Sequence, residues 1–248
     1  MTTPDINAMI ENFVNYGRSE ISQIVQLQGP QNSPKPLYEY KKVLLAAVID
    51  SHARCVFPRG SNRERFVEFM RKFSGWAEID HVSLTQLEGI IQHLPGSDFG
   101  SLRKYVEESI ATWRSGSLIP LSQDPPLQEI LPRWPKREEH GDPLGRLPLE
   151  HLTHGHLFYT YRNSLVHELR APGYSWDMID REEPSYMGGV NNLDGGVKDR
   201  WLLVYPLAFF VKVCLQSLTN LERYLKAGGI DPYQSYTFGE YWIERLNE

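Results

Sequence analysis

The sequence predicts a mainly α-helical protein, a helical bundle with long irregular insertions and one small β-hairpin. Three observations support this fold class. Apolar residues recur at helical spacing over most of the chain, the stretch from Val43 to Ile49 is almost entirely apolar, and segments rich in proline and glycine separate the periodic stretches. With 248 residues, 41% of them hydrophobic, the chain can bury a substantial core as a single domain spanning residues 1–248.

The periodic stretches define the expected helices, and several begin at residues that favour helix starts. Ser61 or Asn62 can cap the third helix, and the sequence from Ser83 resembles a capping box. Gly17 lies inside the first stretch, where a glycine destabilises a helix. The expected helices span residues 5–28, 38–57, 62–73, 83–93, 99–114, 149–170, 206–227 and 238–247, with a loop at 29–36.

Two long segments lack helical periodicity. Residues 115–148 are rich in proline and turn residues, and residues 171–199 contain a Pro-Gly pair near their start. A segment as long as the first is uncommon inside a domain and suggests a functional flap, a wrap around the body, or disorder. Residues 185–190 and 200–205 have strand-like composition on either side of a turn-rich segment, which predicts the hairpin.

Composition and charge limit the class of protein. No apolar run approaches the ~20 residues that cross a bilayer, so a membrane protein is not expected. The first residues, MTTPDINAMIEN, have neither a basic region nor an apolar core, so no secretory signal is expected. Cys55 and Cys214 are far apart, which favours a reduced, cytoplasmic location over a disulfide framework. A net charge of −5 argues against coating nucleic acid through a global basic field, but it allows RNA binding in a local cleft.

Two of the expected helices carry polar groups beside apolar ones. Residues 38–57 contain Asp50 and His52, which the simplest interpretation places where the helix surface leaves the core. Residues 62–73 carry several basic side chains next to aromatic and aliphatic ones. These basic residues are Arg63, Arg65, Arg71 and Lys72.

The stretch LEHLTHGHLFYTYRNSLVHELR, residues 149–170, is the helix around which we expect the rest of the chain to be organised. At about 100° per residue, four apolar and aromatic residues fall on one arc. We therefore expect this arc to be buried. Its members are Phe158, Tyr161, Leu165 and Leu169.

The opposite arc of this helix is polar in an unusual way. It carries His156, Asn163, His167 and Arg170, with Arg162 on the shoulder between the two arcs. Ordinary solvated helix faces are dominated by lysine and glutamate rather than by imidazole, amide and guanidinium groups. The polar arc therefore offers a proton acceptor or donor that titrates near neutrality, a fixed cation and an orienting amide.

The segment from Arg162 to His167 resembles the R-N-x-x-x-H form of the signature of the HEPN superfamily. Members of that superfamily are helical bundles that are often metal-independent ribonucleases. The resemblance covers the helical body of the chain and leaves the long loops outside. It implies a HEPN-like bundle that forms a homodimer, in which two copies of the helix at 149–170 build one composite site. It also implies a toxin or defence effector, with an antitoxin or a paired nucleotidyltransferase as a further partner.

The resemblance implies a metal-independent endoribonuclease with RNA as its substrate, and the residue types suit that chemistry. RNA supplies its own nucleophile, the 2′-hydroxyl, so the protein needs a proton acceptor, charge stabilisation and orientation. His167 can serve as general base or acid, and Arg162 can hold the phosphate with two donors. Asn163 would orient the imidazole or the phosphate, while Arg170 and His156 would contact the substrate. No cofactor is expected.

The residues themselves leave an alternative open. Arg162 and His167 are separated by roughly 140° around a straight helix, so they do not face one point from a single chain. Their spacing also fits a polar face packed on a neighbouring helix or at a dimer contact. A non-catalytic HEPN-like module that binds RNA, a nucleotide or a protein partner is therefore the alternative function. His151, His154 and His156 invite a zinc interpretation, but no cysteine or carboxylate joins them at ligand spacing, so no metal site is expected.

Overall fold

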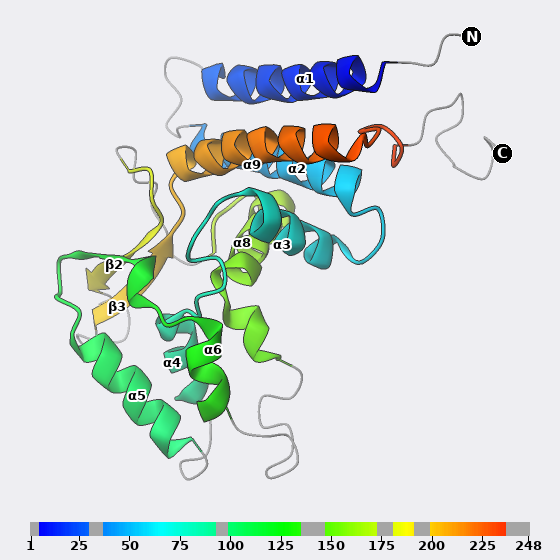
Figure 1. Ribbon diagram of the computed structural model, residues 1–248. Coiled ribbons are helices and arrows are strands. Elements are labelled where there is room, and N and C mark those ends of the chain that lie inside the picture. Colours follow the sequence, from blue (N-terminus) through cyan, green and yellow to red (C-terminus); the bar gives the residue numbers. More distant parts are fainter. Residues whose placement is uncertain are drawn as a thin grey trace.

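A layered bundle of helices with a small sheet at one end makes up the described part of the chain (Figure 1). The computed structural model describes residues 5–29, 37–92, 99–134, 147–172, 181–190 and 199–236. The predicted helix at 238–247 lies outside these residues, and so does almost all of the predicted loop at 29–36. The mainly helical fold class is confirmed, together with a small β element of three antiparallel strands.

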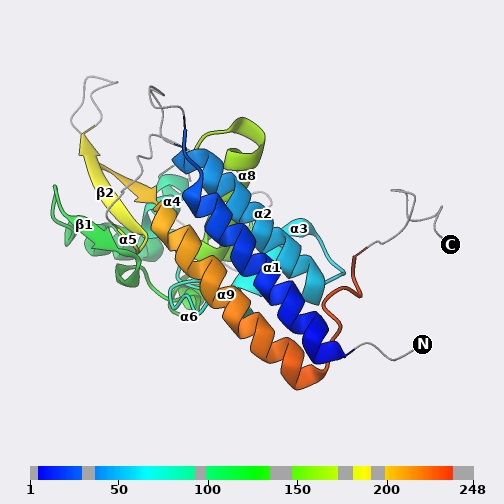
Figure 2. The same ribbon diagram turned by 90° about the horizontal axis from the view of Figure 1, so that it is seen from above.

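Five long helices form the bundle. α1 (Ile6–Gln26) packs on α2 (Tyr38–Val56) and on α9 (Leu207–Gly228), and it runs antiparallel to both (Figure 2). α3 (Asn62–Phe73) and α8 (His154–Glu168) lie below this layer in Figure 1 and pack on α2 from the other side. Each layer therefore buries its apolar face against the next one.

α2 is the central helix, as its apolar run predicted. Leu45, Ala46 and Ile49 are fully buried where α2 meets its neighbours. Leu44 is 41% exposed, however, and Ala47 is also exposed. The run is therefore only partly covered, and one apolar side of α2 remains open to solvent beside α1.

The sequence sets several helix ends locally. Ser61 caps α3 in a reciprocal capping box with Glu64, and α9 ends at Gly229, whose φ of 57° is left-handed. α1 continues unbroken through Gly17. A Cβ atom at Gly17 would lie 3.0 Å from Nε2 of His52, so the glycine permits a close approach between α1 and α2. His52, expected where the helix surface leaves the core, is instead buried.

The sheet has the order β1-β2-β3 and is antiparallel throughout. β2 (Ser185–Val190) and β3 (Asp199–Val204) form the predicted hairpin, which is confirmed. β1 (Leu118–Pro120) pairs with the other edge of β2. It belongs to the segment predicted to have little regular structure. Three residues are too few for a strand to be recognised by alternation of polar and apolar residues.

Three further helices lie below the sheet in Figure 1. They come from the two predicted helices at 83–93 and 99–114 and from the segment that was expected to be irregular. Their bounds are α4 (Leu84–Ile91), α5 (Gly100–Ala111) and α6 (Leu127–Ile130).

The buried carboxylate of Asp124 connects α4, β2 and α8. Oδ1 of Asp124 accepts a hydrogen bond from the backbone N–H of Leu84 at 2.9 Å, at the start of α4. Oδ2 accepts a hydrogen bond of 2.5 Å from the hydroxyl of Tyr186 on β2, and it lies 2.7 Å from Nε2 of His154 on α8. Because the side chains of Asp124 and His154 are completely buried, this cluster fixes the fold and is closed to a substrate.

The prediction of one helix over residues 149–170 is wrong at its start. Leu149–Leu152 forms a short 3-10 helix, and Thr153 is extended, with φ −73° and ψ 153°. α8 begins only at His154. The N–H groups of residues 154 and 155 donate to carbonyls of residues 81 and 79, at 3.0 and 2.8 Å. Carbonyl groups distant in sequence therefore accept the hydrogen bonds that a preceding helical turn would otherwise accept.

The prediction is also wrong at the end of this helix. Phe158, Tyr161 and Leu165 are buried as expected, but Leu169 is 58% exposed. Its φ of 52° is left-handed, which ends α8 at Glu168 and turns the Leu169 side chain away from the buried arc.

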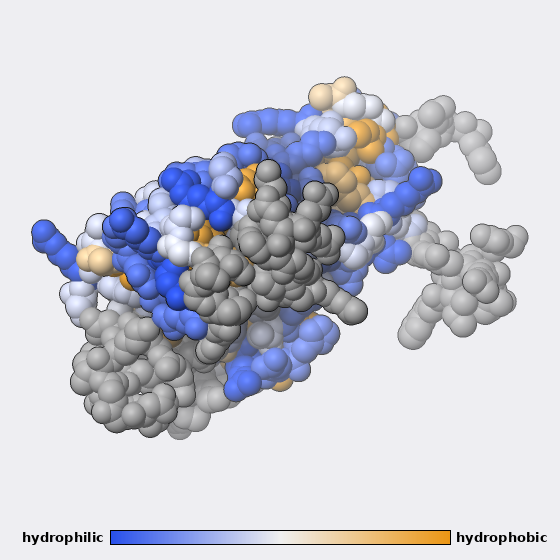
Figure 3. Space-filling view, turned by 90° about the horizontal axis from the view of Figure 1, so that it is seen from below, coloured by the Kyte–Doolittle hydropathy of each residue, from blue (hydrophilic) through white to orange (hydrophobic). Residues whose placement is uncertain are grey.

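Buried apolar side chains form one continuous core through the bundle, and both cysteines are free, buried thiols. Figure 3 shows that the face farthest from α1 is mostly hydrophilic over its described part. Several large apolar side chains are exposed on the opposite side, on α1 and α2; they are Tyr16, Val25, Leu27, Tyr40 and Leu44. Among the described residues, no helix is long and apolar enough to span a membrane.

Candidate functional site

Arg162 lies in a pocket where α2, α3 and α8 meet. Its Nε donates a hydrogen bond of 2.8 Å to Oδ2 of Asp50 on α2, and its Nη2 also bonds to this oxygen. Its Nη1 donates to Oδ1 of Asn163 at 2.9 Å. Only 15% of the Arg162 side chain is exposed, so the guanidinium is held in one orientation by a carboxylate and an amide.

Three arginines line this pocket, and we call it the arginine pocket. Arg54 comes from α2, Arg65 from α3 and Arg162 from α8, around a volume of about 340 Å³. Arg65 also contacts the side-chain oxygen of Asn62. Asp50 is the carboxylate among the described lining residues, where arginines outnumber it by three to one. Such a pocket attracts an anion, and guanidinium groups match the geometry of phosphate oxygens.

Burial raises the pKa of the Asp50 carboxyl, while the charge of Arg162 and its hydrogen bond act in the opposite direction. Arg65 also acts to lower this pKa. From the sequence, Asp50 was expected only where a helix surface leaves the core, and this interpretation misses its contact with Arg162. The one available signal was an acidic residue directly after a long apolar run.

A second basic cluster adjoins the arginine pocket through the ring of Tyr159. The guanidinium carbon of Arg162 lies 5.8 Å from the centre of this ring, and that of Arg63 lies 5.4 Å from it. Nη1 of Arg63 is 3.3 Å from Nδ1 of His151, whose ring lies 4.9 Å from that of His156. Basic side chains of α2, of the start of α3 and of the start of α8 therefore lie next to one another.

His156, predicted to contact substrate, belongs to this second cluster and does not line the arginine pocket. Burial lowers its pKa to about 4, and the nearby charges of His151 and Arg63 act in the same direction. At neutral pH its ring is therefore uncharged. It offers a hydrogen bond rather than a positive charge.

His167 and Arg170 lie on the exposed surface beyond the arginine pocket. His167 does not line that pocket, as its angular separation from Arg162 predicted. Arg170 is 78% exposed and pairs with Glu168 at 2.9 Å. The structure thus brings Arg162 and Asn163 together with Asp50, while His167 and Arg170 do not line the arginine pocket of their own chain.

The three histidines of the zinc interpretation have separate surroundings. His154 is buried against Asp124, whereas His151 and His156 contact each other and Arg63. Within the described ranges, no group of three or more histidine, cysteine or acidic side chains is arranged to hold a metal ion.

Comparison of this chain with protein-family models, with curated proteins and with solved structures finds no match. Fold and site together define a mainly helical bundle with an arginine-lined pocket at the junction of three helices.

Proposed function

We propose that this protein is a metal-independent endoribonuclease that holds an RNA phosphate in the arginine pocket. The observation that carries the proposal is the convergence of Arg54, Arg65 and Arg162 from three different helices on one pocket. Arg162 is also the first residue of the segment that resembles the HEPN signature. A pocket of this charge is specific for an anion, and the adjoining basic cluster at Arg63 would extend the contact along an RNA backbone.

The proposed reaction uses the substrate's own 2′-hydroxyl. Its oxygen attacks the adjacent phosphorus while its proton leaves, and the bond to the 5′-oxygen of the next nucleotide breaks as that oxygen gains a proton. The products are a 2′,3′-cyclic phosphate and a 5′-hydroxyl end. Arg162 would stabilise the negative charge that develops on the phosphate oxygens. His167 would move the proton.

This proposal includes a homodimer, because His167 lies outside the arginine pocket of its own chain. A second copy of α8 facing the first would bring the partner's imidazole to the phosphate. The arrangement can be tested by mixing two inactive variants, Arg162→Ala and His167→Ala. Mixed dimers would contain one intact composite site, so about a quarter of the wild-type activity should return. No recovery on mixing exchangeable dimers, or a monomer that still cleaves, would contradict a composite site.

The alternative is a module that binds RNA without cleaving it. Two contacts favour this alternative: Arg162 is already hydrogen-bonded to Asp50, and Asn163 is turned toward Arg162 rather than toward the imidazole. In this case the arginine pocket and the cluster at Arg63 would bind the ribose-phosphate backbone, with no proton transfer by His167.

One experiment separates the two functions. A single-stranded RNA and a DNA of the same sequence are incubated with the protein in EDTA, and both binding and product ends are measured. The nuclease should cleave only the RNA and leave cyclic phosphates. Arg162→Ala and His167→Ala should each reduce the rate by about 10²–10⁴-fold, and Arg162→Lys should not restore it, because lysine lacks the two-pronged geometry.

Arg223→Ala is the matched control, because Arg223 is exposed on α9 and lines neither basic cluster. RNA binding that Arg162→Ala weakens, without any cleavage, would support the binding module. Cleavage that stays undiminished in His167→Ala, or that requires an added divalent ion, would refute the proposed mechanism.

A further inference from the structure

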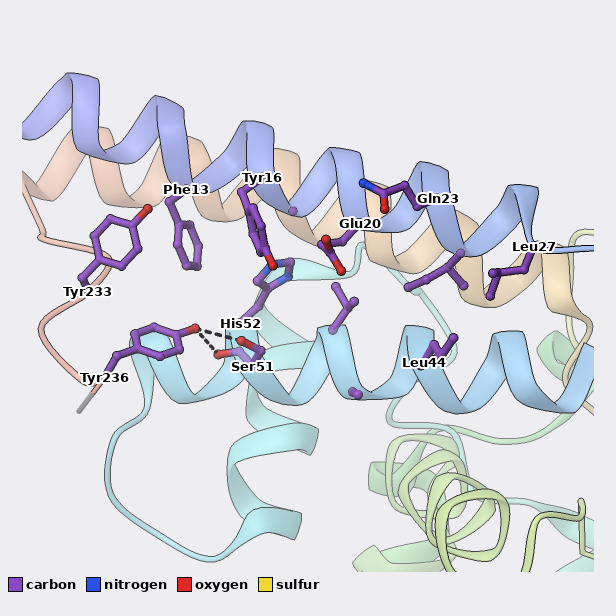
Figure 4. Close-up of a pocket in the computed structure, with 14 residues that line it drawn as sticks. Phe13, Tyr16, Glu20, Gln23, Leu27, Leu44, Ser51, His52, Tyr233 and Tyr236 are labelled. Atoms are coloured by element: carbon purple, nitrogen blue, oxygen red, sulfur yellow. Dashed lines mark hydrogen bonds between the residues drawn. The ribbon is translucent and has the colours of Figure 1, made fainter. Parts of the chain in front are cut away.

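A second and larger pocket lies between α1 and α2 and is bordered at one end by residues that follow α9 (Figure 4). Its volume is about 580 Å³, which is in the range of small-molecule sites. Most of its wall is apolar or aromatic. Phe13 and Tyr16 line it from α1, Leu44 and Val48 from α2, and Tyr233 from the chain after α9. The exposed apolar sides of α1 and α2 meet in this pocket.

Several polar groups of the pocket already have partners inside the protein. The hydroxyls of Ser51 and Tyr236 lie 2.9 Å apart, and the Tyr236 hydroxyl also donates to the Ser51 carbonyl at 2.9 Å. The amide of Gln23 donates to the Ser19 hydroxyl at 3.0 Å. These groups shape the pocket walls but have less capacity left for a ligand.

His52 is different, because its imidazole has no hydrogen-bond partner among the described residues and yet lines the pocket. Its side chain is 5% exposed, and its ring lies 5.6 Å from that of Phe13. Gly17 packs closely against Nε2, since a Cβ at this position would lie 3.0 Å from that atom. Burial lowers the pKa of His52 to about 4, so at neutral pH the ring is uncharged and one of its nitrogens can accept a hydrogen bond.

Glu20 gives the pocket its charge. It is the one charged side chain among the lining residues, where no lysine or arginine occurs, and it has no ion-pair partner in the described part of the chain. Figure 4 shows Glu20, Tyr16 and His52 pointing into the same part of the pocket. A carboxylate beside an aromatic ring and an uncharged imidazole favours a cation and disfavours an anion.

We infer that the pocket between α1 and α2 binds a small aromatic amine. The flat apolar part of the ligand packs against Tyr16 of α1 and against Leu44 and Val48 of α2. Its ammonium group pairs with Glu20 and donates a hydrogen bond to His52. This pocket adjoins the arginine pocket through Ser51 and Tyr236, but it differs from it in charge and in ligand, so probes of opposite charge distinguish the two.

Three probes that share an indole ring test the charge preference: tryptamine, 3-ethylindole and indole-3-propionate. Binding to the full chain is measured by calorimetry and by the NMR shifts of the His52 imidazole. Tryptamine should bind most tightly and indole-3-propionate most weakly. Glu20→Gln should reduce the preference for tryptamine over 3-ethylindole by roughly five- to tenfold, because it removes the carboxylate and keeps the shape.

A blocking variant tests the location. Ala47 is exposed on α2 and lines the pocket, so Ala47→Phe should fill it and abolish binding of all three probes. Ala227→Phe adds the same ring on an exposed part of α9 and should leave binding unchanged. Equal binding of the three probes, unchanged His52 signals, or tryptamine binding that survives in Ala47→Phe would overturn the inference. If Ala47→Phe fails to fold, the Glu20→Gln and His52 measurements still decide it.

Discussion

Asp50 on α2 and Arg162 on α8 form an ion pair between residues 112 positions apart in the sequence. The pair joins two helices of the bundle, and it also places a carboxylate in a pocket whose other charged side chains, among the described residues, are arginines. Asp50 should therefore stabilise the fold while weakening the binding of an anion in the pocket. The same contact that fixes Arg162 competes with any phosphate for its guanidinium.

Asp50→Asn should separate these two effects. Loss of the ion pair should lower the free energy of unfolding by roughly 1–3 kcal/mol, since a partly buried guanidinium loses a charged partner. Removal of the negative charge should tighten binding of single-stranded RNA. It should also steepen the slope of log binding constant against log salt concentration by about 0.7. Denaturant melts and anisotropy titrations at several salt concentrations measure both. Glu107→Gln, on the exposed surface of α5, is the control. Weaker RNA binding in Asp50→Asn would show that Asp50 serves to position Arg162 for the ligand.

A glycine at position 169 should stabilise the end of α8. Leu169 adopts a left-handed conformation while its side chain is mostly exposed, so Leu169→Gly should raise the free energy of unfolding by about 1 kcal/mol. Leu165→Ala, four residues earlier and fully buried, should lower it by roughly 2–5 kcal/mol. Gly229→Ala at the left-handed end of α9 should be destabilising, as the converse substitution. A destabilised Leu169→Gly variant in chemical denaturation would contradict this account of the helix end.

Two glycines in helices should respond to alanine with opposite signs. Gly89 in α4 is exposed and has no atom within 4 Å of a Cβ placed there, so Gly89→Ala should stabilise the protein by about 0.4–1 kcal/mol. At Gly17, a Cβ would lie 3.0 Å from His52 and 3.1 Å from Leu218. Gly17→Ala should therefore destabilise by roughly 1–3 kcal/mol, because overpacking outweighs the gain in helix propensity. Thermal melts that show equal stabilisation would mean that α1 and α2 separate easily.

Stability should fall as the pH drops from about 6.5 to about 4. Burial lowers the pKa of His52 to about 4 in the folded protein, whereas the unfolded chain binds a proton near pH 6.5. Between these values the unfolded state holds more protons, so acid favours unfolding by about 1.4 kcal/mol per pH unit for one such group. The pKa of His156 is also lowered to about 4, so this residue adds to the loss of stability in acid.

His52→Phe should lower the number of protons taken up on unfolding by about one, and so reduce the slope of the free energy of unfolding against pH. The phenyl ring should preserve the aromatic contact with Phe13. Free energies of unfolding in urea, measured from pH 4 to pH 7, provide the slope. His156→Phe should give a second, separate reduction. A slope that remains at its wild-type value in both variants would assign the acid sensitivity to other groups.

Local signals in the sequence were enough to predict several elements. Helical periodicity predicted α1 through Gly17 as well as α2, α3 and α9, and the capping residue Ser61 marked the start of α3. Strand-like composition on both sides of a turn marked the β2–β3 hairpin. These features depend on residues within one or two turns of each other, so a single sequence contains the information that forms them.

Which side chains meet depends on the packing of segments that are distant in sequence. The interruption at Thr153 follows from hydrogen bonds to residues 79–83, and β1 exists as a strand because β2 lies beside it. The convergence of Arg54, Arg65 and Arg162 on Asp50, and the burial of His52 against Gly17, each require helices that are distant in sequence to pack side by side. Helix periodicity specifies the face on which a side chain lies, but it does not specify which neighbouring helix covers that face. Packing between distant segments therefore decides whether a polar side chain becomes a buried partner, a pocket wall or solvent-exposed surface.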